Sequence, residues 1–121
     1  MTCQETFNMV ATHLLTQGRR SKSTRGCRYR YYDDFTQTML KCSGGCLIPD
    51  DQYSSSMEGH HVLYSSVANV LEQCGHDLTM VLNLQDIHDR FPVGEWVFRL
   101  KDYAIKMGLN TDVIDNFKKG A

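Results

Sequence analysis

Apolar side chains recur at helical spacing at the start of this chain, and this spacing predicts an amphipathic helix. The stripe consists of Phe7, Val10, Ala11, Leu14 and Leu15. Thr2 and Glu5 have the spacing of a capping box, in which each side chain satisfies a backbone amide of the first turn. Gly18 is placed to end the helix in a left-handed conformation.

Alternation with a period of two replaces the helical spacing at residues 27–32 and predicts a half-buried strand. One face of this strand carries Cys27, Tyr29 and Tyr31, and the other carries Arg28, Arg30 and Tyr32. Asp33 and Asp34 supply a turn, and residues 35–41 are predicted to return as a second strand. Such a hairpin would bring Cys27 close to Cys42. Residues 19–26 carry no apolar side chain and are predicted to form a flexible loop.

The second half of the chain is predicted to be helical, because apolar residues recur at helical spacing over residues 62–73, 78–91 and 96–107. Pro92 is expected in the first turn of the third helix, and Thr111 is placed to begin a short final helix that buries Phe117. The wide apolar face of residues 78–91 is typical of a central helix, in which His88 is expected to be packed with a hydrogen-bond partner.

Together these patterns predict one α+β domain over residues 1–121. In this fold the small hairpin and the loop of residues 42–59 pack on a bundle of about four or five helices.

Composition narrows the classes of function. A formal net charge of −1 argues against a protein built as a whole for nucleic acid. No apolar run approaches the roughly 20 residues of a membrane span. The five cysteines are an odd number with no signal-peptide pattern before them, which favours free or metal-bound thiols in a reducing cytoplasm. The oligomeric state stays open.

The charges are unevenly distributed along the chain, which indicates a contact surface formed by a basic stretch at residues 19–32 and an acidic loop at residues 50–58. The predicted contact residues are Arg19, Arg20, Lys22, Arg25, Arg28, Arg30, Tyr29, Tyr31, Tyr32, Asp50, Asp51, Tyr53 and Glu58. Such a surface would suit an acidic protein. A strand on which arginines alternate with tyrosines would also suit a nucleic acid, by following the phosphates and stacking on the bases.

Residues 41–59 combine thiols, glycines and carboxylates in a mixture that core packing does not need. Cys42 and Cys46 flank two glycines, as a close pair of zinc ligands would. The predicted zinc set is Cys27, Cys42, Cys46 and His61. The alternative is that these thiols are structural, because buried cysteine behaves as a small apolar residue.

The residue types of this region also suit two other kinds of chemistry. Backbone amides at Gly44 and Gly45 would suit a phosphate or a sequestered nucleotide. A cysteine with a neighbouring histidine would suit nucleophilic catalysis. No complete catalytic signature surrounds either cysteine, which favours a non-enzymatic protein with no required cofactor.

The order Cys27-x-Tyr29-Arg30, then Lys41-Cys42-Ser43-x-Gly45-Cys46-Leu47-Ile48-Pro49-Asp50-Asp51-x-Tyr53, then Met57-Glu58-Gly59 resembles a group of small tailed-phage and prophage proteins. Their core reads CxYR, KCAxGCLIPDxxY and MEG, with alanine where this chain has Ser43. The resemblance implies a phage context and a bacterial host cytoplasm, and it carries over no activity. Together with the small size of the chain, the lack of a complete catalytic signature and the segregated charges, this context favours an accessory protein that binds a host protein, for example a defence or nucleic-acid-handling enzyme.

Overall fold

The computed structural model describes residues 1–24 and 26–120, which form five α-helices and two small antiparallel strand pairs. The elements are α1 (Cys3–Gln17), β1 (Lys22–Ser23), β2 (Gly26–Cys27), β3 (Arg30–Asp33), β4 (Thr38–Lys41), α2 (Ser65–Gln73), α3 (Leu78–Arg90), α4 (Trp96–Lys106) and α5 (Asp112–Gly120). The predicted α+β class, rich in helix with one small hairpin, is therefore confirmed.

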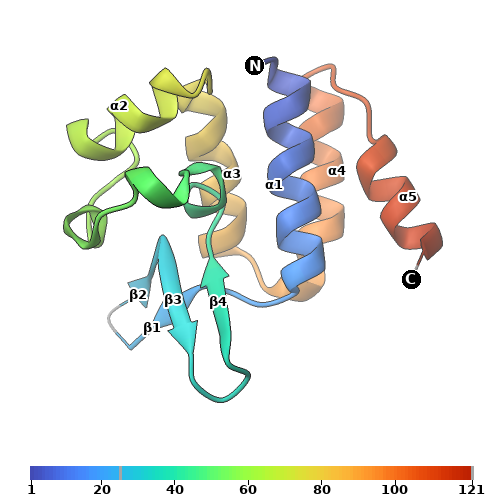
Figure 1. Ribbon diagram of the computed structural model, residues 1–121. Coiled ribbons are helices and arrows are strands. Elements are labelled where there is room, and N and C mark those ends of the chain that lie inside the picture. Colours follow the sequence, from blue (N-terminus) through green and yellow to red (C-terminus); the bar gives the residue numbers. More distant parts are fainter. Residues whose placement is uncertain (25, 121) are drawn as a thin grey trace.

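The helices form the body of the domain, and the β3–β4 hairpin projects from it (Figure 1). Helix α1 packs against α3, α4 and α5, and α2 packs against α3. Three short 3₁₀ turns (Gly45–Leu47, Asp50–Gln52 and Ser55–Met57) connect the hairpin to α2. The largest side chains that are fully buried between these elements are Trp96, Phe7, Leu14, Leu71, Leu84, Leu100 and Ile114.

Both ends of α1 agree with the sequence prediction. Thr2 accepts a hydrogen bond from the Glu5 amide, and Glu5 accepts one from the Thr2 amide, which completes the capping box. Gly18 follows the last turn with φ +63°, in the left-handed region. These signals are local, so the sequence alone was sufficient to place them.

The predicted hairpin exists, but both of its strands are shorter than expected. The first begins at Arg30, which pairs with Lys41, and the second begins at Thr38 rather than at residue 35, because residues 34–37 form the turn. The preceding residues Gly26–Cys27 pair instead with Lys22–Ser23, inside the segment predicted as a loop. The first strand of the hairpin starts only at Arg30 because the amides of Tyr29 and Arg30 donate to the Glu58 carboxylate and not to another strand.

Three helix predictions need correction. Helix α2 begins at Ser65 rather than at residue 62, and Val62 is buried in the loop before it. Pro92 precedes a 3₁₀ turn, Val93–Glu95, that leads into α4. Phe117, which was expected to be buried, is 38% exposed on α5, and Ile114 is the fully buried residue there.

We expect acid to destabilise the fold partly through His76, a buried histidine whose Nδ1 lies 2.7 Å from Thr6 Oγ1. Burial and then the N-terminal amino group lower the pKa of His76. The unfolded chain therefore binds the proton more readily, and stability falls as pH drops through and below the ordinary histidine pKa of about 6.5.

The measurement is the free energy of unfolding in urea at several pH values between about 5 and 8. His76→Asn keeps a hydrogen-bond acceptor for Thr6 without a titrating ring, so its stability should depend less on pH. The exposed His61→Asn is the matched control and should follow the wild type. Equal pH slopes for the wild type and His76→Asn would contradict this assignment.

Candidate functional site

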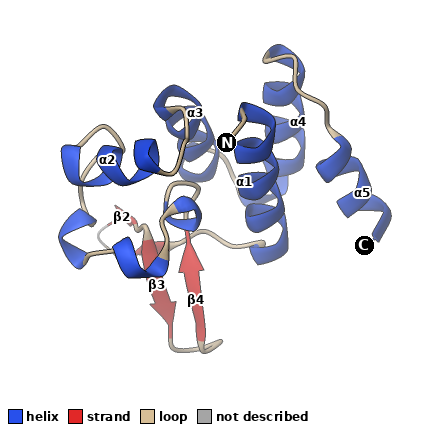
Figure 2. Ribbon diagram, turned by 45° about the horizontal axis from the view of Figure 1, so that its top comes forward, coloured by secondary structure: helices blue, strands red, loops and turns tan. Residues whose placement is uncertain are grey.

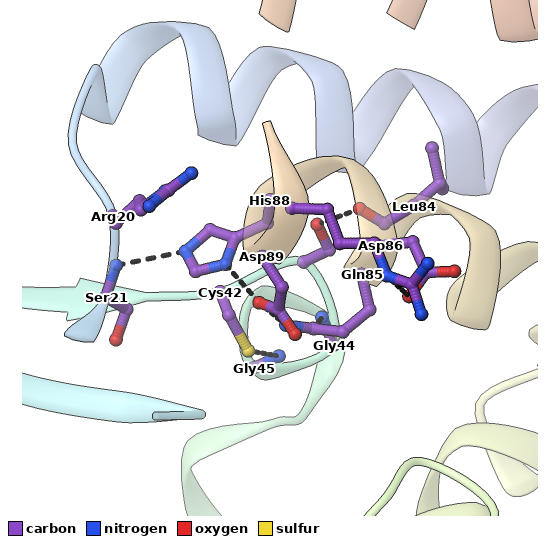
Figure 3. Close-up of polar contacts among 12 residues, drawn as sticks. Arg20, Ser21, Cys42, Gly44, Gly45, Leu84, Gln85, Asp86, His88 and Asp89 are labelled. Carbon is purple, nitrogen blue, oxygen red and sulfur yellow. Dashed lines mark hydrogen bonds and ion pairs between the residues drawn. The ribbon is translucent and has the colours of Figure 1, made fainter. Parts of the chain in front are cut away.

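Residues 42–46, which we call the glycine bend, are held against α3 by side-chain hydrogen bonds (Figure 3). Ser43 Oγ donates to the Leu84 carbonyl at 2.8 Å, and the Gly44 amide donates to Gln85 Oε1 at 2.9 Å. The Gly45 amide donates to Cys42 Sγ at 3.3 Å. The polar atoms of the bend are therefore satisfied by the protein, which leaves the Gly44 and Gly45 amides unsuited to the predicted phosphate contact.

Next to the bend, α3 carries a buried hydrogen-bond chain centred on His88. The Ser21 amide donates to His88 Nε2 at 3.0 Å, so Nδ1 carries the proton and donates to Asp89 Oδ1 at 2.7 Å. Gln85 Nε2 donates to the same carboxylate oxygen at 2.7 Å. His88 is fully buried, so the prediction of a packed histidine with a partner is confirmed.

The thiol of Cys27 lies beside this chain, with its Sγ within 4.8 Å of the ligand atoms of His88 and Asp89. Burial, and then the nearby Asp89 carboxylate, raise the pKa of Cys27 to about 11. Burial alone would raise the pKa of Asp89, but the hydrogen bond from His88 and the neighbouring Cys27 thiol lower it. The arrangement is a carboxylate held by hydrogen-bond donors, and at neutral pH Cys27 is a thiol rather than a nucleophilic thiolate.

The other two predicted cysteine ligands are also protonated thiols. Burial raises the pKa of Cys46 to about 12, and its Sγ donates to the Ser43 carbonyl at 3.1 Å. Burial likewise raises the pKa of Cys42, which is inaccessible to solvent. Neither cysteine has the lowered pKa that activates a nucleophile.

Among the described residues, one group of three metal-binding side chains lies close together: Cys27, His88 and Asp89, with ligand atoms within 4.8 Å of one another. The predicted zinc set of Cys27, Cys42, Cys46 and His61 contributes only Cys27 to it. A metal on His88 Nδ1 would move the proton to Nε2, where it would oppose the Ser21 amide. The residues of this group therefore fit a structural hydrogen-bond chain better than a metal centre.

A pocket of about 430 Å³ opens beside this chain, between α3 and residues 59–62. Cys27, Cys42 and His61, three of the four predicted zinc ligands, line it, and so does Asp89. The structure thus brings these residues to the same pocket, although, among the described residues, the ligand atoms of Cys27, Cys42 and His61 do not form a cluster of metal-binding size.

The predicted contact residues are also brought together, but they bind one another. Glu58 accepts the amides of Tyr29 and Arg30 at 2.9 and 3.0 Å and the Tyr53 hydroxyl at 2.7 Å. Its Oε1 also lies 3.4 Å from Arg28 Nε, a charge contact. Most of the polar capacity of this carboxylate is thus used inside the protein.

Three of the other basic residues in the described part of the chain also bind within the protein. Arg30 pairs with Asp50 at 2.8 Å and lies over the Tyr53 ring, at 4.5 Å from its centroid. Arg19 pairs with Asp33 at 2.7 Å, and Arg20 donates to the Phe91 carbonyl at 2.6 Å. Lys22, on β1, is exposed.

The other predicted contact residues differ in their exposure. Tyr29 is buried, with its hydroxyl donating to the His60 carbonyl, and Tyr31 is half-buried. Asp51 and Tyr32 are exposed. Arg25 lies outside the described residues.

Sequence reasoning named Tyr32 as a contact residue but missed the apolar surface that it forms with Phe35 and Met39 on the hairpin. Phe35 at its tip is 96% exposed, and Tyr32 and Met39, paired across the strands, are 49% and 46% exposed. Beside them runs a groove of about 910 Å³ between α1 and β4, whose walls include Met9 and Met39. The signal was a phenylalanine directly after the Asp33–Asp34 turn, where a polar residue is usual.

These features define a small helix-rich α+β domain with a projecting apolar hairpin. Comparison with protein-family models, curated proteins and solved structures finds no match to this chain. In the described part of the chain, no helix combines the length and the apolar character that crossing a bilayer requires.

Proposed function

We propose that this protein acts by binding another protein through its hairpin surface, which we define as Tyr32, Phe35, Met39 and the adjoining Met9 of α1. The observation that carries the proposal is the 96% exposure of Phe35 at the tip of a hairpin that stands away from the helices (Figure 2). A large aromatic side chain in this position gains free energy only when a partner covers it.

Two further observations favour binding over the alternatives. The thiols of Cys27, Cys42 and Cys46 have raised pKa values, which argues against thiolate catalysis. The pairing of Arg28 and Arg30 with carboxylates lowers the positive charge available to nucleic acid. The proposed contact is therefore mainly apolar.

The partner in this proposal is a protein of a bacterial host, and the proposed setting is the host cytoplasm during phage or prophage activity. Covering the hairpin surface would block or redirect that protein. The support is the resemblance of residues 27–59 to phage proteins together with the exposed apolar hairpin. A defence or nucleic-acid-handling enzyme is the kind of host protein that we propose.

The experiment is capture from host lysate on the immobilised full chain, followed by titration of the captured protein after its purification. Phe35→Ser is expected to weaken binding at least about tenfold, because exposed aromatic anchors dominate interface energies. Leu63→Ser is the matched control, since Leu63 is an exposed apolar residue that is not part of the hairpin surface. Its binding should equal that of the wild type.

The salt dependence of binding distinguishes this proposal from the nucleic-acid alternative. Binding through the hairpin surface should persist as salt rises, whereas binding to phosphates weakens steeply. Equal capture by the wild type, Phe35→Ser and Leu63→Ser would overturn the proposal. So would capture of nucleic acid alone.

A further inference from the structure

Strand β4 has an open edge that faces α1. It pairs with β3 along one edge, and in the described part of the chain no strand pairs with the other edge. Both ribbon views place β4 between β3 and α1 (Figures 1 and 2). The groove of about 910 Å³ between α1 and β4 therefore runs along this edge, and residues 38–41 line it.

The hydrogen bonds of Arg30 and Lys41, which face each other across the hairpin, fix the direction of the β4 backbone. The Arg30 amide donates to the Glu58 carboxylate rather than to β4. The Lys41 amide donates to Gln17 Oε1 on α1, on the edge opposite β3. Hydrogen-bonded and non-hydrogen-bonded pairs alternate in an antiparallel ladder. The amide and the carbonyl of Met39, two residues before Lys41, therefore also point toward the groove.

Gln17 makes the contacts with this edge that a neighbouring strand would make. Its Oε1 accepts the Lys41 amide at 2.9 Å, and its Nε2 donates to the Lys41 carbonyl at 3.0 Å. One carboxamide thus satisfies both backbone groups of one residue, as the facing residue of a hydrogen-bonded pair does. Among the described residues, no side chain makes the equivalent contacts with the Met39 backbone, so the edge is open to a strand there.

The groove beside this edge suits an uncharged, largely apolar segment. Its lining contains no carboxylate among the described residues, and the Lys41 ammonium lies 3.6 Å from Asp50. Burial lowers the pKa of His13, so this ring in the lining is neutral at neutral pH. The apolar lining consists of Met9, Met39, Leu40 and Cys46. Two of these residues, Met9 and Met39, also belong to the hairpin surface, so a single partner would cover both.

We propose that the groove binds an extended, largely apolar segment of the partner protein, which adds to the hairpin as a third strand beside β4. The inference rests on the proposed function, because the segment belongs to the protein that covers the hairpin surface. The segment pairs with the backbone of Met39 and, in place of the Gln17 carboxamide, with that of Lys41. Main-chain bonds to an open sheet edge provide affinity in this mode of recognition, and contacts with alternate side chains provide specificity.

Random decapeptides displayed on phage and selected on the immobilised full chain supply the probe. We expect the selected peptides to alternate between apolar and polar residues, as a half-buried strand does. A synthetic copy of one peptide is then methylated at one backbone nitrogen at a time. Methylation should weaken binding at least about tenfold at every second position of the paired segment, because alternate amides face β4. Selection of no peptide, or methylation effects without this alternation, would overturn the proposal.

Variants of the chain test the same pairing from the other side. Met39→Pro removes the amide that faces the groove but no bond of the hairpin ladder, and proline is tolerated at such edge positions. It should bind the peptide at least about tenfold more weakly than Met39→Ala, the matched control that loses the same side chain but keeps the amide. Circular dichroism and thermal unfolding check that each variant is folded. Equal binding by the two variants would overturn the proposal.

Gln17→Ala tests the replacement of the carboxamide. This variant should bind the peptide roughly fivefold more tightly than the wild type, because the peptide no longer displaces a competing group from Lys41. Binding that is no tighter than that of the wild type would overturn the pairing at Lys41.

Phe35→Ser separates failure of this inference from failure of the proposed function. Phe35 lies at the hairpin tip, outside the groove lining, so Phe35→Ser should bind the peptide like the wild type while it captures less partner protein. If Phe35→Ser loses the partner but Met39→Pro binds the peptide as well as Met39→Ala, strand addition alone is overturned. If Met39→Pro loses the peptide but Phe35→Ser keeps the partner, the proposed contact at the tip is overturned and strand addition stands.

Discussion

Gly45→Ala should destabilise the protein by about 3 kcal/mol or more, one of the largest effects expected of any single methyl group in this fold. A Cβ at this position would lie 2.0 Å from the carbonyl oxygen of Tyr29 and 2.8 Å from its carbonyl carbon. Both atoms belong to the backbone, so no rotation of a flexible side chain relieves the contact.

The two segments that meet at Gly45 are both held in place by hydrogen bonds, so they cannot easily move apart to make room for a methyl group. The Tyr29 amide donates a hydrogen bond to the Glu58 carboxylate, which fixes the backbone. The Tyr29 hydroxyl donates a hydrogen bond to the His60 carbonyl, which fixes the side chain. The bend itself is fixed to α3 through Ser43 and Gly44. Separation of these two segments would open the buried chain of His88 beside them.

Urea unfolding measures this effect, with Gly94→Ala as the matched control. Gly94 lies in the 3₁₀ turn before α4, and a Cβ there would meet nothing within 4 Å. The free energy of unfolding of Gly94→Ala should stay within about 0.5 kcal/mol of the wild-type value. Stability of Gly45→Ala close to that of Gly94→Ala would show that the bend tolerates the displacement and that its packing on Tyr29 is not a constraint.

The features that the sequence predicted well are those set by neighbouring residues. The capping box of Thr2 and Glu5 joins groups only three residues apart. The apolar stripe likewise identified the buried face of α1, with Phe7, Val10, Ala11 and Leu14 buried. Local physics determined these elements, so a single sequence was sufficient.

The features that it missed depend on groups far apart in the chain. The start of β3 is determined by Glu58, 29 residues after Tyr29, and the bend is held by Gln85, 41 residues after Gly44. The segregated charges of the basic stretch and the acidic loop looked like two free surfaces. Pairs such as Arg30 with Asp50 show that charges separated along the sequence neutralise each other in the folded protein. A charge pattern alone does not distinguish these outcomes.

Glu58→Gln should destabilise the fold by about 2–4 kcal/mol, because the carboxylate is largely buried and serves both backbone donors at the start of β3. An amide has one acceptor oxygen and one donor nitrogen. In either orientation its NH₂ group would oppose the amide of Tyr29 or of Arg30, and one buried donor would lose its partner.

Tyr53→Phe tests a single bond to the same carboxylate and should cost about 1 kcal/mol. Glu72→Gln on α2, an exposed site, is the control for loss of charge and should change stability by less than about 0.5 kcal/mol. The same urea titration serves all three variants. If Glu58→Gln cost no more than Tyr53→Phe, the amides of Tyr29 and Arg30 would be satisfied by water, and the carboxylate would not determine where β3 begins.

If the larger loss is found, Glu58→Gln should also weaken partner binding, since it loosens the base of the strand that presents Tyr32. Phe35→Ser should weaken the same binding without loss of stability, which distinguishes a residue that contacts the partner from one that orients the hairpin.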